Sequence, residues 1–271
     1  MPELPEVETT KRGIEPHIVK RTIRAVHIRT PKLRWPIPRA LKKHLPGETI
    51  RSVKRRAKYI LIEFDHGTLL THLGMSGSMR ICPASRAWRK HDHFALELSS
   101  GKQLRLHDPR KFGSVLWSKG DPEKHKLLVK LGPEPLHKKF DGAHLYAASR
   151  GRKVSIKQFI MNHHVVVGVG NIYASEALFL STIHPKRAAE RVSQGRMKTL
   201  ASNIKVILRR SIKQGGTTLN DFLNEKGEPG YFAQQLNVYG RAGEQCVSCN
   251  STIKSIVLGQ RSTFYCPNCQ R

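Results

Sequence analysis

Four cysteines near the end of the chain constrain its fold most strongly. They form two Cys-x-x-Cys pairs, Cys246 with Cys249 and Cys266 with Cys269, separated by residues 250–265. Each pair presents two thiolates from a tight turn, and two such turns at the ends of a short hairpin complete the four-sulfur shell that a structural zinc ion prefers. Two disulfides or a redox pair are the alternatives, but the sequence has no secretion signal. The spacing therefore predicts one structural Zn²⁺ in a zinc finger over 236–271.

The charge balance points to a polyanionic partner. The chain has 48 Lys and Arg against 20 Asp and Glu, a formal net charge of +28 over 271 residues. Nucleic acid is the commonest polyanion in a cell, and phosphate contacts supply affinity that depends on salt. Because 38% of the residues are hydrophobic, the chain can build real cores and is not a disordered basic tail. Charge alone fits a ribosome-associated or architectural protein as well as an enzyme acting on nucleic acid.

No stretch approaches the 18 or so consecutive apolar residues of a membrane span. The first ten residues are acidic and lack both the basic and the apolar region of a signal peptide. We therefore expect a cytoplasmic protein with no membrane partner.

The pattern of hydrophobic residues divides the chain. A helix is expected from about Glu3 to Arg21, followed by short β-type runs between residues 22 and 118, which predict two antiparallel sheets. A stretch rich in Pro, Gly and Lys begins at 131 and predicts an interdomain linker over 131–150. The expected fold class is α+β, with an N-terminal β-sandwich domain over 1–130.

Beyond the linker the hydrophobic period becomes helical. Helices are expected over 155–163, 171–183 and 192–214, within a domain over 151–235. The glycine-rich turn 168–170 leads into the second of these helices. Its amides and the helix dipole could hold a phosphate, although a turn of this kind is equally typical of an ordinary helix connection.

The chain lacks a P-loop and a carboxylate cluster suited to magnesium, so its N-terminus is the place to look for reactivity. Removal of the initiator Met would leave Pro2 as a free secondary amine, whose pKa of about 8 makes it more nucleophilic at neutral pH than a lysine. Attack on a sugar carbon would give a cationic iminium. Glu3 and Glu6 follow, one to move protons and the other to anchor the first turn. The alternative is a helix start that is simply rich in Pro and Glu.

A resemblance decides between these alternatives. The chain resembles the bacterial formamidopyrimidine-DNA glycosylases over essentially its whole length, in seven segments that occur in the family's order. These are 1–8, 55–60, 72–77, 90–93, 108–113, 168–176 and the terminal cysteine pattern. The resemblance implies a β-sandwich, a helix–two-turn–helix module and a zinc finger. It also implies a monomeric repair enzyme that excises 8-oxoguanine and formamidopyrimidines from DNA, preferentially opposite cytosine, and nicks the strand by β,δ-elimination.

The resemblance also implies roles for individual residues. Pro2 would attack C1′ and form a Schiff base, Glu3 would transfer protons at the sugar, and Lys58 would contact phosphate and assist the chemistry. Glu6 would be structural. Met75, Arg110 and Phe112 would fill the gap left by the extruded base. The other DNA-binding residues would be His72, His91, Lys111, Asn171 and Arg261.

The segment 217–232 corresponds to the family's lesion-recognition loop, with Thr217, Thr218 and Tyr231. Two positions depart from the family pattern: Lys111 replaces an arginine, and Asn162-His163 replaces an acidic residue and an amide. The first weakens a bidentate phosphate contact, and the second concerns local packing. His91 and His93, with Asp92 between them, look like the family's structural triplet rather than a second metal site.

Three alternatives stay open. The sister enzyme endonuclease VIII shares the proline nucleophile but prefers oxidised pyrimidines. It typically has Gly at the position of Leu4 and lacks the Met75, Arg110 and Phe112 combination, so both features favour the purine enzyme. A non-catalytic clamp that bends DNA would not need Pro2, Glu3 and Lys58. A ribosomal role would leave the N-terminal motif without a purpose. We therefore expect a glycosylase and lyase associated with the bacterial nucleoid.

Overall fold

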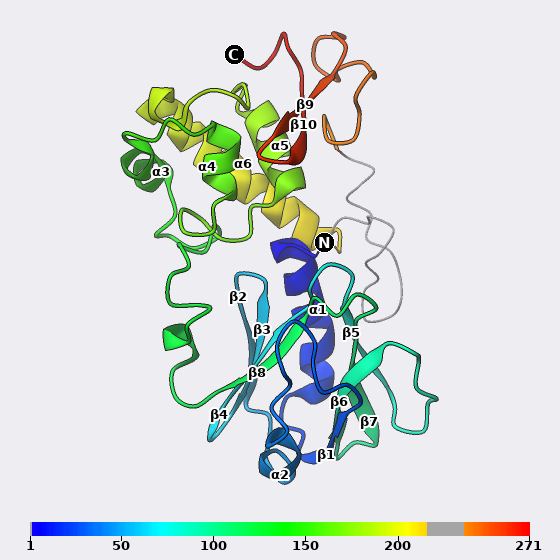
Figure 1. The fold of residues 1–271 in the computed structure, drawn as a ribbon. Coiled ribbons are helices and arrows are strands. Elements are labelled where there is room, and N and C mark those ends of the chain that lie inside the picture. The colour runs from blue at the N-terminus through cyan, green and yellow to red at the C-terminus, as the bar shows by residue number, and fades with distance from the viewer. Residues whose placement is uncertain (1, 216–235) are drawn as a thin grey trace. The chain divides into compact units, whose positions relative to one another are not determined.

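The computed structural model describes residues 2–215 and 236–271. They form two compact units, one over residues 2–129 and the other over 130–213 and 236–271 (Figure 1). No helix within these described ranges is long and apolar enough to cross a membrane.

The first unit contains two four-stranded antiparallel sheets, which confirms the predicted sandwich. The strand order is β2-β3-β4-β8 in one sheet and β1-β6-β7-β5 in the other. The strands are β1 (Ile23–Ile28), β2 (Ser52–Arg56), β3 (Tyr59–Phe64), β4 (Gly67–His72), β5 (Ser78–Pro83), β6 (Asp92–Leu98), β7 (Lys102–His107) and β8 (Ser114–Ser118).

Helix α1 (Leu4–Ile18) packs against both sheets of the first unit, as Figure 1 shows. The stripe of Val7, Ile14 and Ile18 is fully buried in the core between them. The helix ends before Arg21, where the sequence placed its end, because Lys20 adopts a left-handed φ of 64°. Two short helices complete this unit, α2 (Leu41–His44) and η1 (Pro122–Lys124).

The second unit is mainly helical. It contains α3 (Gly142–Ser149), α4 (Ile156–Met161), α5 (Asn171–Leu180), η2 (Ala189–Arg191) and α6 (Gln194–Lys213). The helices predicted over 155–163, 171–183 and 192–214 are all present, each a few residues shorter than expected. Helices α3 and α5 both pack on α6 around one apolar core.

The sequence predicted an interdomain linker over 131–150, but in the structure these residues belong to the second unit. Part of the expected linker is helix α3, which Asp141 caps by accepting a hydrogen bond from the His144 amide at 2.8 Å. A Cβ atom on Gly142 would lie 2.4 Å from the Cα of Lys198, so glycine permits the close approach of α3 to α6. The apolar pattern of α3 is weak because only Leu145 and a few small residues are buried.

The chain ends in the predicted zinc hairpin, built from β9 (Lys254–Leu258) and β10 (Arg261–Tyr265). The two strands pair antiparallel, with Arg261 opposite Leu258. The connecting Gly259 and Gln260 have φ angles of 54° and 60°, the left-handed conformation that a tight two-residue hairpin turn requires.

Candidate functional site

The predicted catalytic residues Pro2 and Glu3 lie at the N-terminus of α1, where Glu3 is the residue that caps the helix. The Glu6 carboxylate accepts the backbone N–H of Glu3 at 2.8 Å, and the Glu3 carboxylate accepts the backbone N–H of Glu6. Both side chains are buried, as is Pro2. Carboxylates at a helix N-terminus are stabilised by the unpaired amides and the helix dipole. Glu6 therefore has the anchoring position that the sequence predicted, and Glu3 is held directly beside Pro2.

Lys58 and His72 lie together at one end of the β2-β3-β4-β8 sheet. Lys58 is half-buried in the tight turn between β2 and β3, and Tyr59 after it pairs with His72, their rings 4.9 Å apart. Burial and the neighbouring charges of Lys58 and Arg34 lower the pKa of His72 to about 4. The imidazole is therefore neutral at pH 7.

The hydrogen bonding of His72 determines its tautomer. The backbone N–H of Gly74 donates to Nδ1 of His72 at 3.0 Å. Because Nδ1 accepts, the single proton of the neutral ring lies on Nε2. Nε2–H can therefore donate to a phosphate oxygen without a change of charge.

Two turns of the first unit bring the predicted gap-filling residues together. Gly74, next to Met75, packs so closely on the other turn that a Cβ would lie 2.6 Å from the carbonyl carbon of Phe112. The Phe112 side chain is 46% exposed, and the Arg110 guanidinium lies 5.2 Å from the centre of its ring. A large exposed aromatic at the tip of a turn is suited to insertion between base pairs.

A side-chain hydrogen bond holds the backbone of the turn over 108–113. The Asp108 carboxylate accepts the Gly113 amide at 2.7 Å, and Lys111 has a φ of 55°. The Lys111 side chain is exposed, and its Nζ donates to Thr30 Oγ1 at 3.4 Å. Lysine at this position thus retains an accessible positive charge.

Asp92 lies among three histidine rings at one end of the β1-β6-β7-β5 sheet. His91 contacts the rings of His93 and His107, with centroid distances of 6.1 and 5.8 Å. Asp92 pairs with His107 rather than with its sequence neighbours. Among the described residues, the four cysteines form the only group close enough to hold a metal ion.

In the second unit, Asn171 and Arg261 are brought together by the packing of α5 on β10. Asn171 is the first residue of α5, and its Nδ2 donates to the Ser262 carbonyl at 3.0 Å. Arg261 precedes Ser262 and is exposed. The glycine-rich turn does lead into a helix N-terminus, as predicted, with Gly168 at a φ of 75°.

Two buried charged residues that the sequence interpretation missed hold the zinc hairpin. Glu176 accepts hydrogen bonds of 2.8–2.9 Å from the backbone amides of Asn237, Val238 and Tyr239 and from the Asn237 side chain. Lys157 donates to Thr263 Oγ1 at 2.7 Å and to the Ser262 carbonyl at 3.1 Å. The available signals were the position of Glu176 at the end of the 168–176 segment and its presence in a largely apolar helix.

The four cysteines fit a zinc ion. Their sulfurs all lie within 4.8 Å of one another, with 3.9 Å between Cys246 and Cys269 and 3.4 Å between Cys249 and Cys266. A tetrahedral zinc ion bound to four thiolates needs sulfur separations of about 3.8 Å. Four sulfurs fill the coordination shell, so this site is structural.

The predicted lesion loop over 217–232, with Thr217, Thr218 and Tyr231, lies outside the described residues.

Comparisons with known proteins agree with this architecture. Residues 1–115 match the family model of the formamidopyrimidine-DNA glycosylase N-terminal domain, 131–222 match its H2TH domain, and 243–271 match the zinc finger found in FPG and IleRS. A formamidopyrimidine-DNA glycosylase of Thioalkalivibrio sulfidiphilus is 57% identical over 271 residues, which is 100% of both chains.

Solved structures show the same similarity. Lactococcus lactis Fpg in complex with DNA containing an abasic site is 34% identical, with a TM-score of 0.91 over 100% of both chains. MutM in complex with DNA containing carbocyclic 8-oxo-G is 35% identical, also with a TM-score of 0.91 over 100% of both chains.

Proposed function

The chain belongs to the formamidopyrimidine-DNA glycosylase family, and we propose that it is a bifunctional DNA repair enzyme that excises oxidised purines and then nicks the strand. The substrates are 8-oxoguanine and formamidopyrimidines in double-stranded DNA. The observation that carries the proposal is the buried first turn of α1, where reciprocal hydrogen bonds hold Glu3 beside Pro2.

In the proposed reaction, the chemistry begins at Pro2 after removal of Met1. The proline nitrogen attacks C1′ of the damaged nucleotide, the bond from C1′ to the base breaks, and the base leaves with a proton. The sugar ring then opens: the bond from C1′ to O4′ breaks, O4′ takes a proton, and an iminium is left between C1′ and the proline nitrogen. The iminium is positively charged and withdraws electrons, so loss of a proton from C2′ breaks the C3′–O bond and expels the 3′ phosphate. Glu3 moves protons at the sugar and stabilises the cation that develops there.

Lys58 and His72 fit the role of phosphate ligands next to the reacting sugar. Lys58 supplies a charge, and His72, neutral at pH 7, supplies an Nε2–H donor. A neutral donor does not add to the charge repulsion around Lys58. Asn171 and Arg261 contact the phosphate backbone from the second unit, and the zinc ion stabilises the hairpin that carries Arg261.

Extrusion of a base costs a few kcal/mol, and the vacated space must be filled. Phe112 is the wedge, Met75 fills the remaining apolar volume, and Arg110 hydrogen-bonds the orphaned base. Arg110 provides donors that suit cytosine, whose carbonyl and ring nitrogen accept hydrogen bonds. The preferred opposite base is therefore cytosine.

The domains divide these tasks. Residues 1–130 carry the chemistry. The second domain, which the structure extends back to include 131–150, holds the duplex together with the zinc finger over 236–271. The lesion-recognition role that the resemblance implies for Thr217, Thr218 and Tyr231 belongs to the same proposal. One molecule supplies every role, so the enzyme acts as a monomer on nucleoid DNA.

Borohydride trapping tests the proposal. The enzyme is incubated with a duplex carrying 8-oxoguanine opposite cytosine, in parallel with a thymine-glycol duplex, and the adduct is located by peptide mass mapping. We expect a cross-link on the peptide that begins at Pro2, strong with 8-oxoguanine and weak with thymine glycol. Glu3→Gln should slow base release by about 10²–10⁴-fold, the usual contribution of a general acid–base group.

The other outcomes identify the alternatives. A preference for thymine glycol would place the enzyme with the endonuclease VIII type. Tight binding without a cross-link on either duplex would leave a non-catalytic clamp as the better account.

A further inference from the structure

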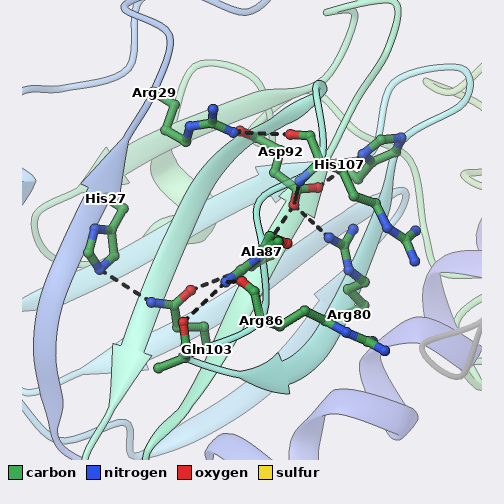
Figure 2. Close-up of polar contacts among 11 residues, drawn as sticks. His27, Arg29, Arg80, Arg86, Ala87, Asp92, Gln103 and His107 are labelled. Atoms are coloured by element: carbon green, nitrogen blue, oxygen red, sulfur yellow. Dashed lines mark hydrogen bonds and ion pairs between the residues drawn. The ribbon is translucent and has the colours of Figure 1, made fainter.

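The outer face of the β1-β6-β7-β5 sheet carries a buried charged layer that the proposed chemistry does not use. The segment 84–91, here called the 84–91 loop, connects β5 to β6 and covers this layer. Figure 2 shows the polar side chains of the sheet pointing toward the backbone of the loop.

Arg105 lies at the centre of the layer, with no exposed surface. Its guanidinium donates to the loop carbonyls of Ala84, Arg86 and Ala87, at 3.4, 2.6 and 3.0 Å. Its Nε donates to Gln103 at 2.8 Å. A buried guanidinium is costly unless its N–H groups are paired, so the loop backbone and Arg105 require each other.

Asp92 holds the other end of the loop. Its carboxylate accepts the Arg89 backbone amide at 3.0 Å and Arg80 Nη2 at 2.6 Å. From outside, Arg29 donates to the carbonyls of Arg89 and Asp92, at 3.0 and 3.2 Å. Both ends of the 84–91 loop are therefore held by charge-assisted hydrogen bonds, which are stronger than neutral ones.

Trp88 fixes the middle of the loop. Its ring lies 4.1 Å from the Arg105 guanidinium and 5.0 Å from that of Arg29, so it is placed between two cations. Cation–π contacts of this kind strengthen when they are shielded from water. The loop is thus attached at both ends and at its centre.

This fixed loop presents unpaired positive charge. Arg86, Arg89 and Lys90 are exposed, and residues 84–91 include no acidic residue. Within the described ranges, none of these three side chains forms an ion pair; the nearby Asp92 is buried and pairs with Arg80. Ordering a flexible loop on binding costs conformational entropy. Because the backbone of the 84–91 loop is already held in place, binding through it would cost less.

The loop ends beside residues expected to contact DNA. The carbonyl of His91 accepts the backbone amide of Asp108 at 2.9 Å. Asp108 begins the turn that carries Arg110 and Lys111. The backbone that carries Arg89 and Lys90 therefore leads directly to the turn that carries Arg110 and Lys111.

We propose that the 84–91 loop is a further DNA-binding element, in which Arg89 and Lys90 contact backbone phosphates and Arg105 is the positioning residue. The inference rests on the proposed function, since it assigns the same duplex to a wider surface. Arg105 itself does not touch DNA, because it is buried beneath the loop.

The salt dependence of binding tests the phosphate contacts. The R89A/K90A variant is compared with K42A/K43A, which removes two exposed lysines of α2. Helix α2 contacts β1, and the backbone at residue 47, just after this helix, bonds to Ile23 at the start of that strand. The 84–91 loop instead contacts Arg29, which follows the other end of β1. The control lysines therefore lie at the opposite end of β1 from the loop.

Binding to an abasic-analogue duplex is measured over a range of salt concentrations. Since each phosphate contact contributes roughly 0.9 to the slope of log K against log salt, R89A/K90A should reduce the slope by about 1.8. K42A/K43A should leave it close to that of the parent. Equal slopes in the two variants would overturn the proposal.

A double-mutant cycle tests the positioning role of Arg105. R105K keeps the positive charge but cannot reach three carbonyls at once. We expect R105K to weaken DNA binding, and R89A/K90A to cost less in the R105K background than in the parent. Additive losses would show that Arg105 does not act through the loop.

R29K provides the same test if R105K does not fold. It keeps the charge at an exposed site while disturbing the contacts to the Arg89 and Asp92 carbonyls. The proposed function is judged separately on the parent. A parent that cleaves lesion DNA while R89A/K90A leaves the slope unchanged refutes only the role of the loop, whereas a parent that binds no duplex refutes both.

Discussion

The sandwich of the first unit and the zinc hairpin of the second are both antiparallel β-structures, but they are stabilised differently. The sandwich encloses a continuous apolar core formed by both sheets and α1. In the hairpin, the buried cluster consists of Phe179, Val238 and Ile253 with two of the cysteines. A two-stranded ribbon with so few apolar contacts is marginal on its own, so it needs a metal.

Polar contacts make up part of the difference. Glu176 and Lys157, both buried on helices of the second unit, bind the backbone at each side of the hairpin. These contacts fix where the hairpin lies, and the zinc fixes its internal shape. The sandwich needs no metal, because the apolar core between its two sheets stabilises it.

Zinc removal should cause the largest loss of stability, and the loss should be confined to the zinc hairpin. Structural zinc contributes roughly 10–16 kcal/mol in isolated fingers, so chelation should unfold β9 and β10. Hydrogen exchange would measure this, with β3 and β4 as an internal reference. Loss of protection in both regions together would contradict the comparison.

Leu96→Ala should destabilise the sandwich independently of the metal. Leu96 is fully buried in the core of the first unit. Deleting such a side chain costs about 2–5 kcal/mol, because a cavity remains. Urea unfolding with and without bound zinc should give the same loss of stability in both states.

Acid should weaken the sandwich through His72. Its pKa is about 4 in the folded protein, lowered from 6.5 by burial and by Lys58 and Arg34. Between these pH values the unfolded chain binds more protons, so this contribution is complete above pH 6.5 and is lost as the pH falls toward 4.

The loss should be on the order of 3 kcal/mol, given about 1.4 kcal/mol for each pH unit of separation. Denaturant unfolding of the first unit across this range measures it. His72→Asn keeps a hydrogen-bond acceptor for Gly74 but does not titrate there, so it should flatten the profile. An unchanged profile in this variant would assign the acid sensitivity to another group.

Arg51→Ala should cause the smallest loss of stability of the sandwich. Arg51 and Asp65 are paired at 2.6 Å, yet their side chains are 57% and 49% exposed. Exposed ion pairs contribute little to the free energy of unfolding, because water and salt screen the two charges. A thermal shift as large as that of Leu96→Ala would show that surface charge, rather than apolar burial, stabilises the sandwich.

Patterns confined to short segments predicted the structure well. The cysteine spacing identified the hairpin, and the apolar stripe of α1 identified its buried face. Helix α3 was missed because its few apolar residues do not form a helical stripe, although Asp141 was a visible cap.

The sequence by itself determined the residue types available for chemistry: an N-terminal Pro-Glu pair, a four-thiolate zinc site and a large excess of positive charge. Only the tertiary structure decided which charges are buried and what they hold. Arg105 lies within an ordinary strand pattern, and only the packing of a distant loop pairs its guanidinium with three carbonyls. Periodicity reports on contacts between near neighbours in the chain, whereas the pairing of a buried charge depends on the whole fold.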